Sequence, residues 1–171
     1  SDNSGATSDD SITTTWKITR KGGKPKASSS GKNINKNRYK VVVKADGVTW
    51  TQAHRRAEKM GGHLAVISSK EELDLVFELA KARPDVWFPA YGHQFGPWLG
   101  GYQEPGSQEP AGGWRWVTGE PMRYTAWAPG EPNSAGGGPQ DKLHLIDYAG
   151  VGESWNDHGD VAIRGFVVEF D

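Results

Sequence analysis

The sequence contains no cysteine, and its charges nearly cancel. The absence of cysteine excludes disulfides, thiolate metal sites and thiol catalysis, and it removes the usual evidence about the redox compartment. With 20 Lys and Arg against 21 Asp and Glu, the net charge of -1 does not favour binding to nucleic acid or to an anionic membrane surface. No apolar run approaches the roughly 20 residues that a membrane-spanning helix needs. We therefore expect neither a nucleic-acid partner nor membrane insertion.

Helix signals are confined to one third of the 171 residues, whereas the chain has 23 Gly, 10 Pro and 8 Trp. This composition favours an irregular, loop-rich fold, and the length suits one domain whose core is large enough without covalent staples. The polar segment 1–10 predicts a disordered tail or linker, and we expect residues 11–171 to form a single domain. The segment has no apolar signal core, which fits either a cytoplasmic chain or one already trimmed of a targeting segment.

Two short helices are predicted in the first half of the chain. Thr49 and Gln52 have the spacing of a capping box, and the first helix ends at a glycine pair. Ser69 and Glu72 form a second capping pair, and Pro84 prevents the second helix from continuing. The buried stripe of the first helix is predicted to be Trp50, Ala53, Ala57 and Met60, and the apolar residues of the second helix at helical spacing are Leu73, Val76, Phe77 and Ala80.

Extended segments surround these helices. The segments SITTTWKITR, which contains Trp16, and RYKVVVK predict two strands before the first helix. Later pieces, among them PWLGGY, GGWRWVTG, DKLHLIDY and GFVVEF, predict a small antiparallel β structure that is interrupted by a long loop. Together the helices and strands indicate the α+β class.

The long loop contains GEPNSAGGGPQD, residues 130–141. Its carboxylates and carboxamides are the hard oxygen donors that calcium takes. The same residues around a proline and a glycine run are also typical of a simple turn. Taken alone, the segment leaves both interpretations open.

Several segments in order resemble the C-type lectin-like domain family. From about Arg38 onward they are TWTQAHRRAEKMGGHLAVISSKEEL, WLGG, GGWRWVTGEP, AWAPGEPN, and WND followed by GFVVEF. The resemblance implies a C-type lectin-like fold of the α+β class, with two helices, small antiparallel sheets and a long calcium-type loop. It also implies a binding module that is not an enzyme. In agreement, the sequence has no GxSxG or P-loop motif and no nucleophile with a neighbouring base.

The disulfides that are usual in this family are absent. The resemblance puts the first cysteine pair at Ala57 and Val168, where two small apolar side chains suit direct packing. It puts the second pair at Lys142 and Asp160, for which we predict a surface ion pair. A cysteine-free version of the fold suits a bacterial, extracytoplasmic protein better than an animal secretory one. The expected location is therefore extracellular, periplasmic or on the cell surface.

The resemblance further implies a calcium site. Its ligands would be Glu131, Asn133, Asn156 and Asp157, with Gln140 or Asp141 as an additional ligand. In the family, a cis peptide bond before Pro132 directs the flanking side-chain oxygens toward one ion. Gln140 stands where the family has a carboxylate, so the site loses one negative charge unless Asp141 moves in through a shift of the loop.

The implied function is calcium-dependent carbohydrate binding. Sugar hydroxyls would contact the same four side chains: Glu131, Asn133, Asn156 and Asp157. The Glu-Pro-Asn order is associated in the family with mannose, glucose, N-acetylglucosamine and fucose. The alternative is a metal-free module that recognises a protein partner or serves a structural role, and calcium dependence separates the two.

The remaining aromatic and histidine residues have mostly structural interpretations. The tryptophans within the motifs are predicted to be core aromatics: Trp98, Trp114, Trp116, Trp127 and Trp155. Trp87 lies outside the motifs and is the better candidate for the surface. His63 and His144, in strand-like segments, are predicted to be packed or hydrogen-bonded, and the histidine spacing does not indicate zinc.

Overall fold

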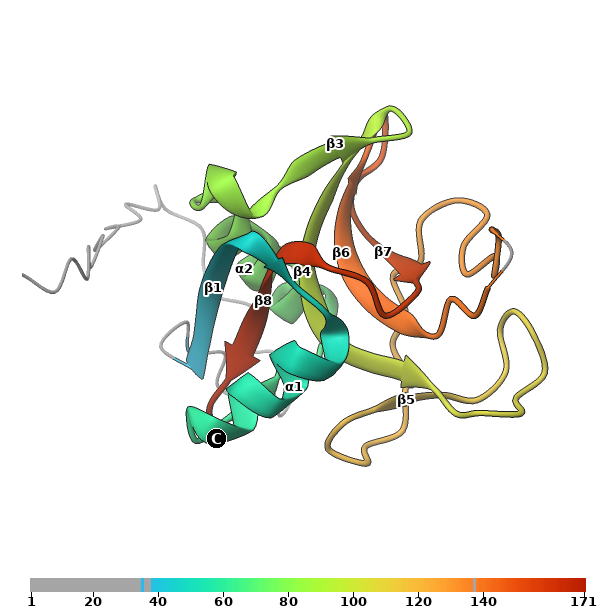
Figure 1. Cartoon of the computed structure of the whole chain (residues 1–171), viewed down its shortest axis with the longest axis horizontal. Coiled ribbons are helices and arrows are strands. Elements are labelled where there is room, and N and C mark those ends of the chain that lie inside the picture. Colours follow the sequence, from blue (N-terminus) through green and yellow to red (C-terminus); the bar gives the residue numbers. More distant parts are fainter. Residues whose placement is uncertain (1–34, 36–37, 137) are drawn as a thin grey trace, which may run out of the picture. The chain divides into compact units, whose positions relative to one another are not determined.

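The structure, a computed structural model, describes residue 35 and residues 38–136 and 138–171. The predicted tail and the strand predicted around Trp16 lie outside these residues. In chain order the elements are β1 (Tyr39–Val48), α1 (Trp50–Lys59), β2 (His63–Leu64), α2 (Lys70–Lys81), the short 3-10 helix η2 (Pro84–Val86), β3 (Phe88–Ala90), β4 (His93–Gln103), β5 (Trp114–Trp116), β6 (Lys142–Tyr148), β7 (Gly152–His158) and β8 (Ile163–Glu169) (Figure 1). Helices and strands together give the predicted α+β class.

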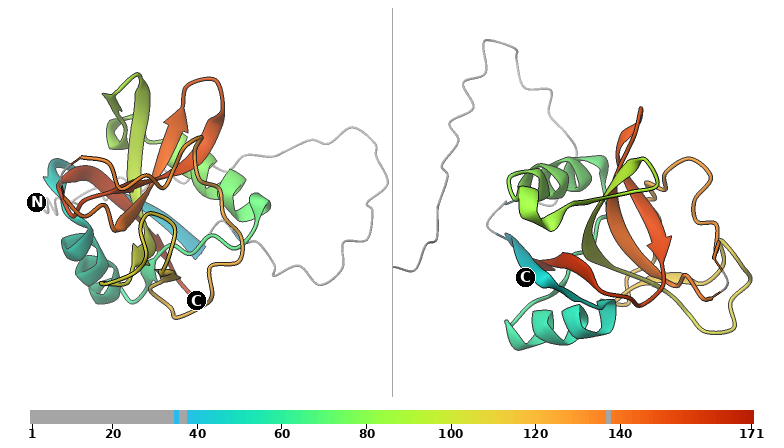
Figure 2. Two further views of the ribbon diagram at one scale, coloured as in Figure 1. Left: turned by 90° about the vertical axis from the view of Figure 1, so that its right-hand side faces the viewer. Right: turned by 45° about the horizontal axis from the view of Figure 1, so that its top comes forward.

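The described strands form one hydrogen-bonded sheet of eight strands, rather than several small sheets. Its path runs β1-β8-β4-β6-β7, with β2 attached to β8, and with β3 and β5 attached to β4. Most pairs are antiparallel, but β4 and β8 meet in parallel at Trp98 and Phe166. The two helices lie on either side of the β1–β8 pair (Figure 2). The second part of the long loop between β5 and β6, coloured orange, lies on the side of β6 and β7 (Figure 1).

Helix α1 begins as predicted. The Thr49 hydroxyl accepts from the Gln52 backbone N at 3.2 Å, and the Gln52 side chain accepts from the Thr49 N at 3.1 Å. The buried residues of this helix are Trp50, Ala53 and Ala57. Met60 was predicted to be buried, but it is 37% exposed. That prediction is wrong because Met60 is the C-cap residue, where the chain leaves the buried stripe and turns into Gly61 with a φ of 86°.

Helix α2 begins at Ser69, whose hydroxyl accepts from the Glu72 N at 3.1 Å. The Glu72 carboxylate does not return to Ser69, because it accepts from the N and the hydroxyl of Ser68 at 2.6 and 2.7 Å. The buried apolar residues are Leu73, Val76 and Ala80, while Phe77 is partly buried. Pro84 starts η2 and does not extend the helix, as predicted.

The tryptophans build much of the core. Three that were predicted in the core are at most 1% exposed: Trp98, Trp116 and Trp155. Two others are partly buried against it: Trp114 and Trp127. Trp87, the predicted surface candidate, is 7% exposed, and its indole N–H donates to the Ala80 carbonyl at 2.8 Å. The surface prediction is wrong because the last turn of α2 offers a carbonyl that a buried indole N–H can satisfy.

Of the two predictions made for the positions of the missing disulfides, one is confirmed and one is wrong. Ala57 and Val168 are both fully buried in one apolar cluster, as predicted. Lys142 and Asp160 do not pair with each other. The Lys142 ammonium lies 4.7 Å from the centre of a Trp50 ring, whereas Asp160 accepts from the Thr51 N at 3.1 Å and from its hydroxyl. The Asp160 carboxylate instead accepts hydrogen bonds at the N-terminus of α1, where unpaired N–H groups favour an anion.

Candidate functional site

A short backbone bridge holds the long loop against β7. Ala128 donates from its N to the Trp155 carbonyl at 2.9 Å, and Trp155 donates from its N to the Ala126 carbonyl at 2.7 Å. Trp155 comes two residues before Asp157 on the same strand. The bridge therefore brings the next turn of the loop, residues 131–134, beside Asp157.

Asp157 is 1% exposed and binds the backbone of this turn. The Asn133 N donates to its two oxygens at 3.1 and 3.3 Å, and the Ser134 N donates to Oδ2 at 2.8 Å. The peptide bond between Glu131 and Pro132 is cis. The Asp157 carboxylate thus holds in place the turn that carries Glu131 and Asn133.

The Glu131 carboxylate lies half-buried beside Asp157. Its Oε1 accepts from Asn133 Nδ2 at 2.9 Å. Its Oε2 is buried, and none of the described residues donates a hydrogen bond to it. Burial, and then the neighbouring Asp157 carboxylate, raise the pKa of Glu131 to about 8. Two carboxylates that share such a site need a proton or a cation between them.

This donor set fits a hard cation. Calcium takes about 6–8 oxygen ligands in forgiving geometry, mainly from carboxylates and carbonyl groups. The Asn133 Oδ1 accepts from the Ala135 N at 2.9 Å and keeps a second lone pair. Glu131 Oε2 is buried without a donor among the described residues, and the carboxyl group to which it belongs lies beside that of Asp157. Glu131, Asn133 and Asp157 could therefore hold a calcium ion.

Asn156 neighbours Asp157 on β7, but its carboxamide has a partner of its own. Asn156 is 8% exposed, and its Nδ2 lies 3.1 Å from Nε2 of His144, the residue opposite it on β6. His144 is fully buried. Burial, and then the neighbouring His158, lower the pKa of His144 to about 3. The ring is therefore neutral at physiological pH and can accept a hydrogen bond.

The last two predicted ligands have different surroundings. The Asp141 carboxylate lies 3.5 Å from the Lys142 ammonium, and the Asp141 carbonyl accepts from the Gln103 N at 2.8 Å. Among the described residues, no hydrogen bond or ion pair joins Gln140 or Asp141 to the loop carboxylates. The structure thus connects three of the six predicted ligands by hydrogen bonds, places Asn156 next to them in the chain, and does not connect the last two.

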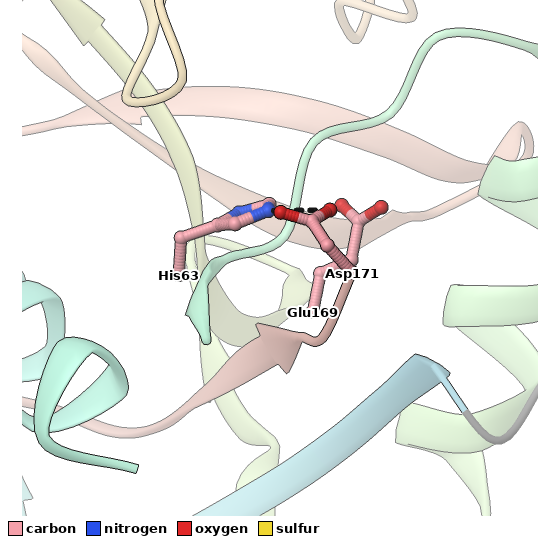
Figure 3. Close-up of side chains that lie close together, drawn as sticks. All are labelled: His63, Glu169 and Asp171. Atoms are coloured by element: carbon pink, nitrogen blue, oxygen red, sulfur yellow. Dashed lines mark hydrogen bonds and ion pairs between the residues drawn. The ribbon is translucent and has the colours of Figure 1, made fainter. Parts of the chain in front are cut away.

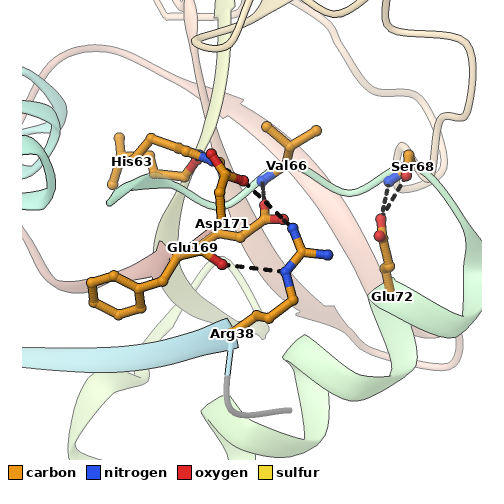
Figure 4. Close-up of polar contacts among 9 residues, drawn as sticks. Arg38, His63, Val66, Ser68, Glu72, Glu169 and Asp171 are labelled. Atoms are coloured by element: carbon orange, nitrogen blue, oxygen red, sulfur yellow. Dashed lines mark hydrogen bonds and ion pairs between the residues drawn. The ribbon is translucent and has the colours of Figure 1, made fainter. Parts of the chain in front are cut away.

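A second group of a histidine and two carboxylates lies where β2 begins and β8 ends. His63, Glu169 and Asp171 each offer an atom within 4.8 Å of the others (Figure 3). The Arg38 guanidinium lies 2.9 Å from Glu169 Oε1 and 3.5 Å from Asp171 Oδ1, and the Val66 N donates to the other Glu169 oxygen at 3.0 Å (Figure 4). Arg38 already supplies positive charge, so we interpret this cluster as an ion-pair network that joins the start of β1 to the end of β8.

The pairing of His144 with Asn156 was not predicted from the sequence. Both residues lie in strands, and the antiparallel hairpin of β6 and β7 places them opposite each other. Gly150 in the connecting turn and Gly152 at the start of β7 adopt φ values of 82° and 92°. A hairpin register counted outward from these glycines is the signal that could have identified the pair.

The comparisons with known proteins agree with this geometry. The sequence profile described as the lectin C-type domain matches residues 46–166. The chain is 30% identical over 113 residues to perlucin-like protein of Mytilus galloprovincialis. This alignment covers 66% of this chain and 63% of that protein. The chain therefore spans less than two thirds of that relative's length.

Two solved structures share the fold. The mouse scavenger receptor C-type lectin carbohydrate-recognition domain has a TM-score of 0.57 and 26% identity, over 82% of this chain and 95% of that one. A calcium-independent type II antifreeze protein has a TM-score of 0.52 and 26% identity, over 77% of this chain and 85% of that one.

These findings bear on the predicted origin and class. The relatives whose organisms are named here are animal proteins, so they do not support the bacterial origin that was expected from the missing cysteines. The homologues are binding proteins and not enzymes, as predicted. The profile match over most of the chain, together with the two-helix fold and its long loop, shows that the chain belongs to the C-type lectin domain family.

Proposed function

We propose that the domain binds carbohydrate through a calcium ion held by Glu131, Asn133, Asn156 and Asp157. The observation that carries the proposal is the buried Glu131 Oε2, which lacks a donor among the described residues and belongs to a carboxylate beside that of Asp157. Leaving two carboxylates together in a half-buried site is costly, and a divalent cation compensates both charges. Membership of the family supports carbohydrate binding in general.

The side chains at this site suit a sugar that presents two adjacent hydroxyls. Calcium, when bound, supplies a centre to which sugar hydroxyls can coordinate in place of water. The Glu131 and Asp157 oxygens can accept hydrogen bonds from these hydroxyls, and the Asn133 and Asn156 amides can donate to them. The Glu-Pro-Asn order supports the mannose, glucose, N-acetylglucosamine and fucose class of sugars.

A metal-free module that recognises a protein partner or serves a structural role is the second candidate. Gln140 favours it, because an uncharged amide stands where the resemblance leads us to expect a carboxylate. The likeness to a calcium-independent antifreeze protein favours it as well. The Asp157 carboxylate also closes the turn by hydrogen bonds without any ion.

We infer an extracellular location with a glycan as the partner. C-type lectin-like domains are generally extracellular or secreted. In the described part of the chain, no helix has both the length and the apolar character needed to cross a membrane.

Calcium is expected to raise the melting temperature of the protein by roughly 5–10 °C relative to EGTA. A ligand at a hundred times its dissociation constant stabilises the folded state by about 2.7 kcal/mol. The measurement is thermal unfolding in EGTA and in a calcium series up to about 10 mM, with magnesium as the control ion. Because magnesium demands stricter octahedral geometry, it should give a smaller shift.

The same protein should bind immobilised mannose in calcium and elute in EGTA, with immobilised galactose as the control. If calcium raised the melting temperature saturably but the protein did not bind the immobilised mannose, the proposed metal site would stand and the proposed sugar binding would be rejected. A melting temperature that is identical in calcium and in EGTA would reject the metal site and favour the protein-recognition module.

Replacing Gln140 with glutamate is expected to tighten calcium binding by about tenfold, or about 1.4 kcal/mol. The added carboxylate raises the negative charge of the loop, and calcium affinity depends on ligand charge. Calorimetric titration with calcium measures the change. Gln108→Glu, at an exposed position in another loop, is the matched control. Equal affinities for the two variants would show that residue 140 lies outside the site.

A further inference from the structure

The hydrogen bonds of His144 define which of its ring nitrogens carries the proton. Nδ1 lies 2.6 Å from the Leu145 carbonyl oxygen, which can only accept, so Nδ1 is the donor. The ring is fully buried among aromatic side chains, and no carboxylate of the described residues pairs with it, so it holds a single proton and Nε2 presents a lone pair. The group that faces this lone pair is Asn156 Nδ2, at 3.1 Å. The amide nitrogen of Asn156 donates to Nε2, and the amide is oriented by the histidine.

The His144 ring cannot easily turn to change this arrangement. It is fully buried, with ring centroids of Phe95 at 4.9 Å, His158 at 5.7 Å and Trp98 at 5.8 Å. If the Asn156 amide flipped, its oxygen would face Nε2, and two acceptors would meet without a hydrogen between them. The packed ring thus selects one of the two amide orientations.

The selected orientation leaves the useful atoms of Asn156 available. One N–H of the carboxamide is used by His144, whereas the second N–H and Oδ1 have no hydrogen-bond partner within the described residues. An amide oxygen is a calcium ligand, and the second N–H can donate to a sugar hydroxyl. Asp157 follows directly on the same strand.

We propose that His144 is a positioning residue of the calcium site, which holds the Asn156 carboxamide with its oxygen available to the cation. The inference rests on the calcium site proposed above. His144 would not touch the ion or the sugar, and it would act only through Asn156. Groups that orient a metal ligand in this way typically change metal affinity by about 10–100-fold when they are removed.

Three variants test this role by calcium titration. His144→Leu removes the acceptor and keeps an apolar side chain, and it should weaken calcium binding by about 10–100-fold. His144→Gln can again accept from Asn156 Nδ2, and it should recover most of the lost affinity. Phe95→Leu changes the packing against the same ring without removing the hydrogen bond, so its calcium affinity should stay near that of the wild type. Melting temperatures in EGTA report any loss of stability separately.

The calcium-free wild type provides a second readout that needs no variant. Nitrogen-15 NMR of the histidine rings should find the His144 proton on Nδ1 and a bare Nε2. A proton on Nε2 would overturn the inference, because the amide oxygen of Asn156 would then face the ring. If the wild type bound calcium and His144→Leu bound it with the same dissociation constant, the role of His144 would be rejected. The calcium site itself would stand. A wild type that binds no calcium would overturn the proposed site and this inference with it.

Discussion

Replacing Asp157 with alanine is expected to lower the free energy of unfolding of the calcium-free protein by about 2–4 kcal/mol. Two backbone N–H groups, those of Asn133 and Ser134, donate to this carboxylate. A hydrogen bond to a charged group contributes about 1.5–3 kcal/mol. Relief of the repulsion between Asp157 and Glu131 offsets part of the loss. Urea unfolding in EGTA, followed by tryptophan fluorescence, measures the difference, and the same variant should give no calcium shift.

Two further variants make this result specific. Asp157→Asn keeps the shape and one acceptor oxygen, so it should lose less stability than the alanine variant while still failing to bind calcium. Asp85→Ala removes an exposed carboxylate far along the chain, and exposed substitutions of this kind change stability by no more than about 0.5 kcal/mol. If Asp157→Ala proved as stable as Asp85→Ala, Asp157 would not organise the loop.

Local chemistry explains which parts of the fold could be predicted from the sequence. The start of α1 depends on Thr49 and Gln52, three residues apart, and both capping bonds are present. Trp87 and Asp160 were misjudged because their partners, the Ala80 carbonyl and the Thr51 backbone, are helix-end groups. The unpaired backbone groups at helix ends bind polar partners that no periodic pattern indicates.

In the candidate site, too, some residues could be predicted from sequence motifs and others could not. Glu131, Asn133 and Asp157 were predicted through their motifs, and the structure joins them by hydrogen bonds. The role of His144 could not be predicted in this way, because it depends on the register between β6 and β7. A shift of one residue in that register would turn every side chain of the strand to the other face. Motifs thus indicate which side chains carry the chemistry, while strand pairing decides what supports them.

The pH dependence of the calcium-free protein follows from Glu131. Its pKa in the folded state is about 8, above the ordinary value of 4.5. Between these two values the folded state binds more protons than the unfolded state, so the free energy of unfolding falls as the pH rises through this window. In the proposed site calcium would compete with the proton for the same carboxylate, so calcium affinity should rise over the same range.

Glu131→Gln is therefore expected to change stability in opposite directions with and without calcium. In EGTA near pH 8 the variant should be more stable than the wild type by about 1–3 kcal/mol, because it no longer holds an unsatisfied buried carboxylate. This gain should shrink as the pH falls from about 8 toward 4.5, because the wild-type carboxyl becomes protonated in the folded state, and below 4.5 it is protonated in both states. In calcium at about a thousand times its dissociation constant the order should reverse, because only the wild type should gain about 4.1 kcal/mol from the ion.

Urea unfolding at several pH values, in EGTA and in calcium, measures both effects in one series. Glu120→Gln, an exposed glutamate of the same loop, is the matched control and should behave like the wild type throughout. A Glu131→Gln protein that still responded to calcium would remove Glu131 from the ligand set. A variant with no stability gain in EGTA would show that Glu131 and Asp157 share no uncompensated charge. The crossover would tie the instability of the calcium-free loop to its capacity for a cation, because one carboxylate oxygen is responsible for both.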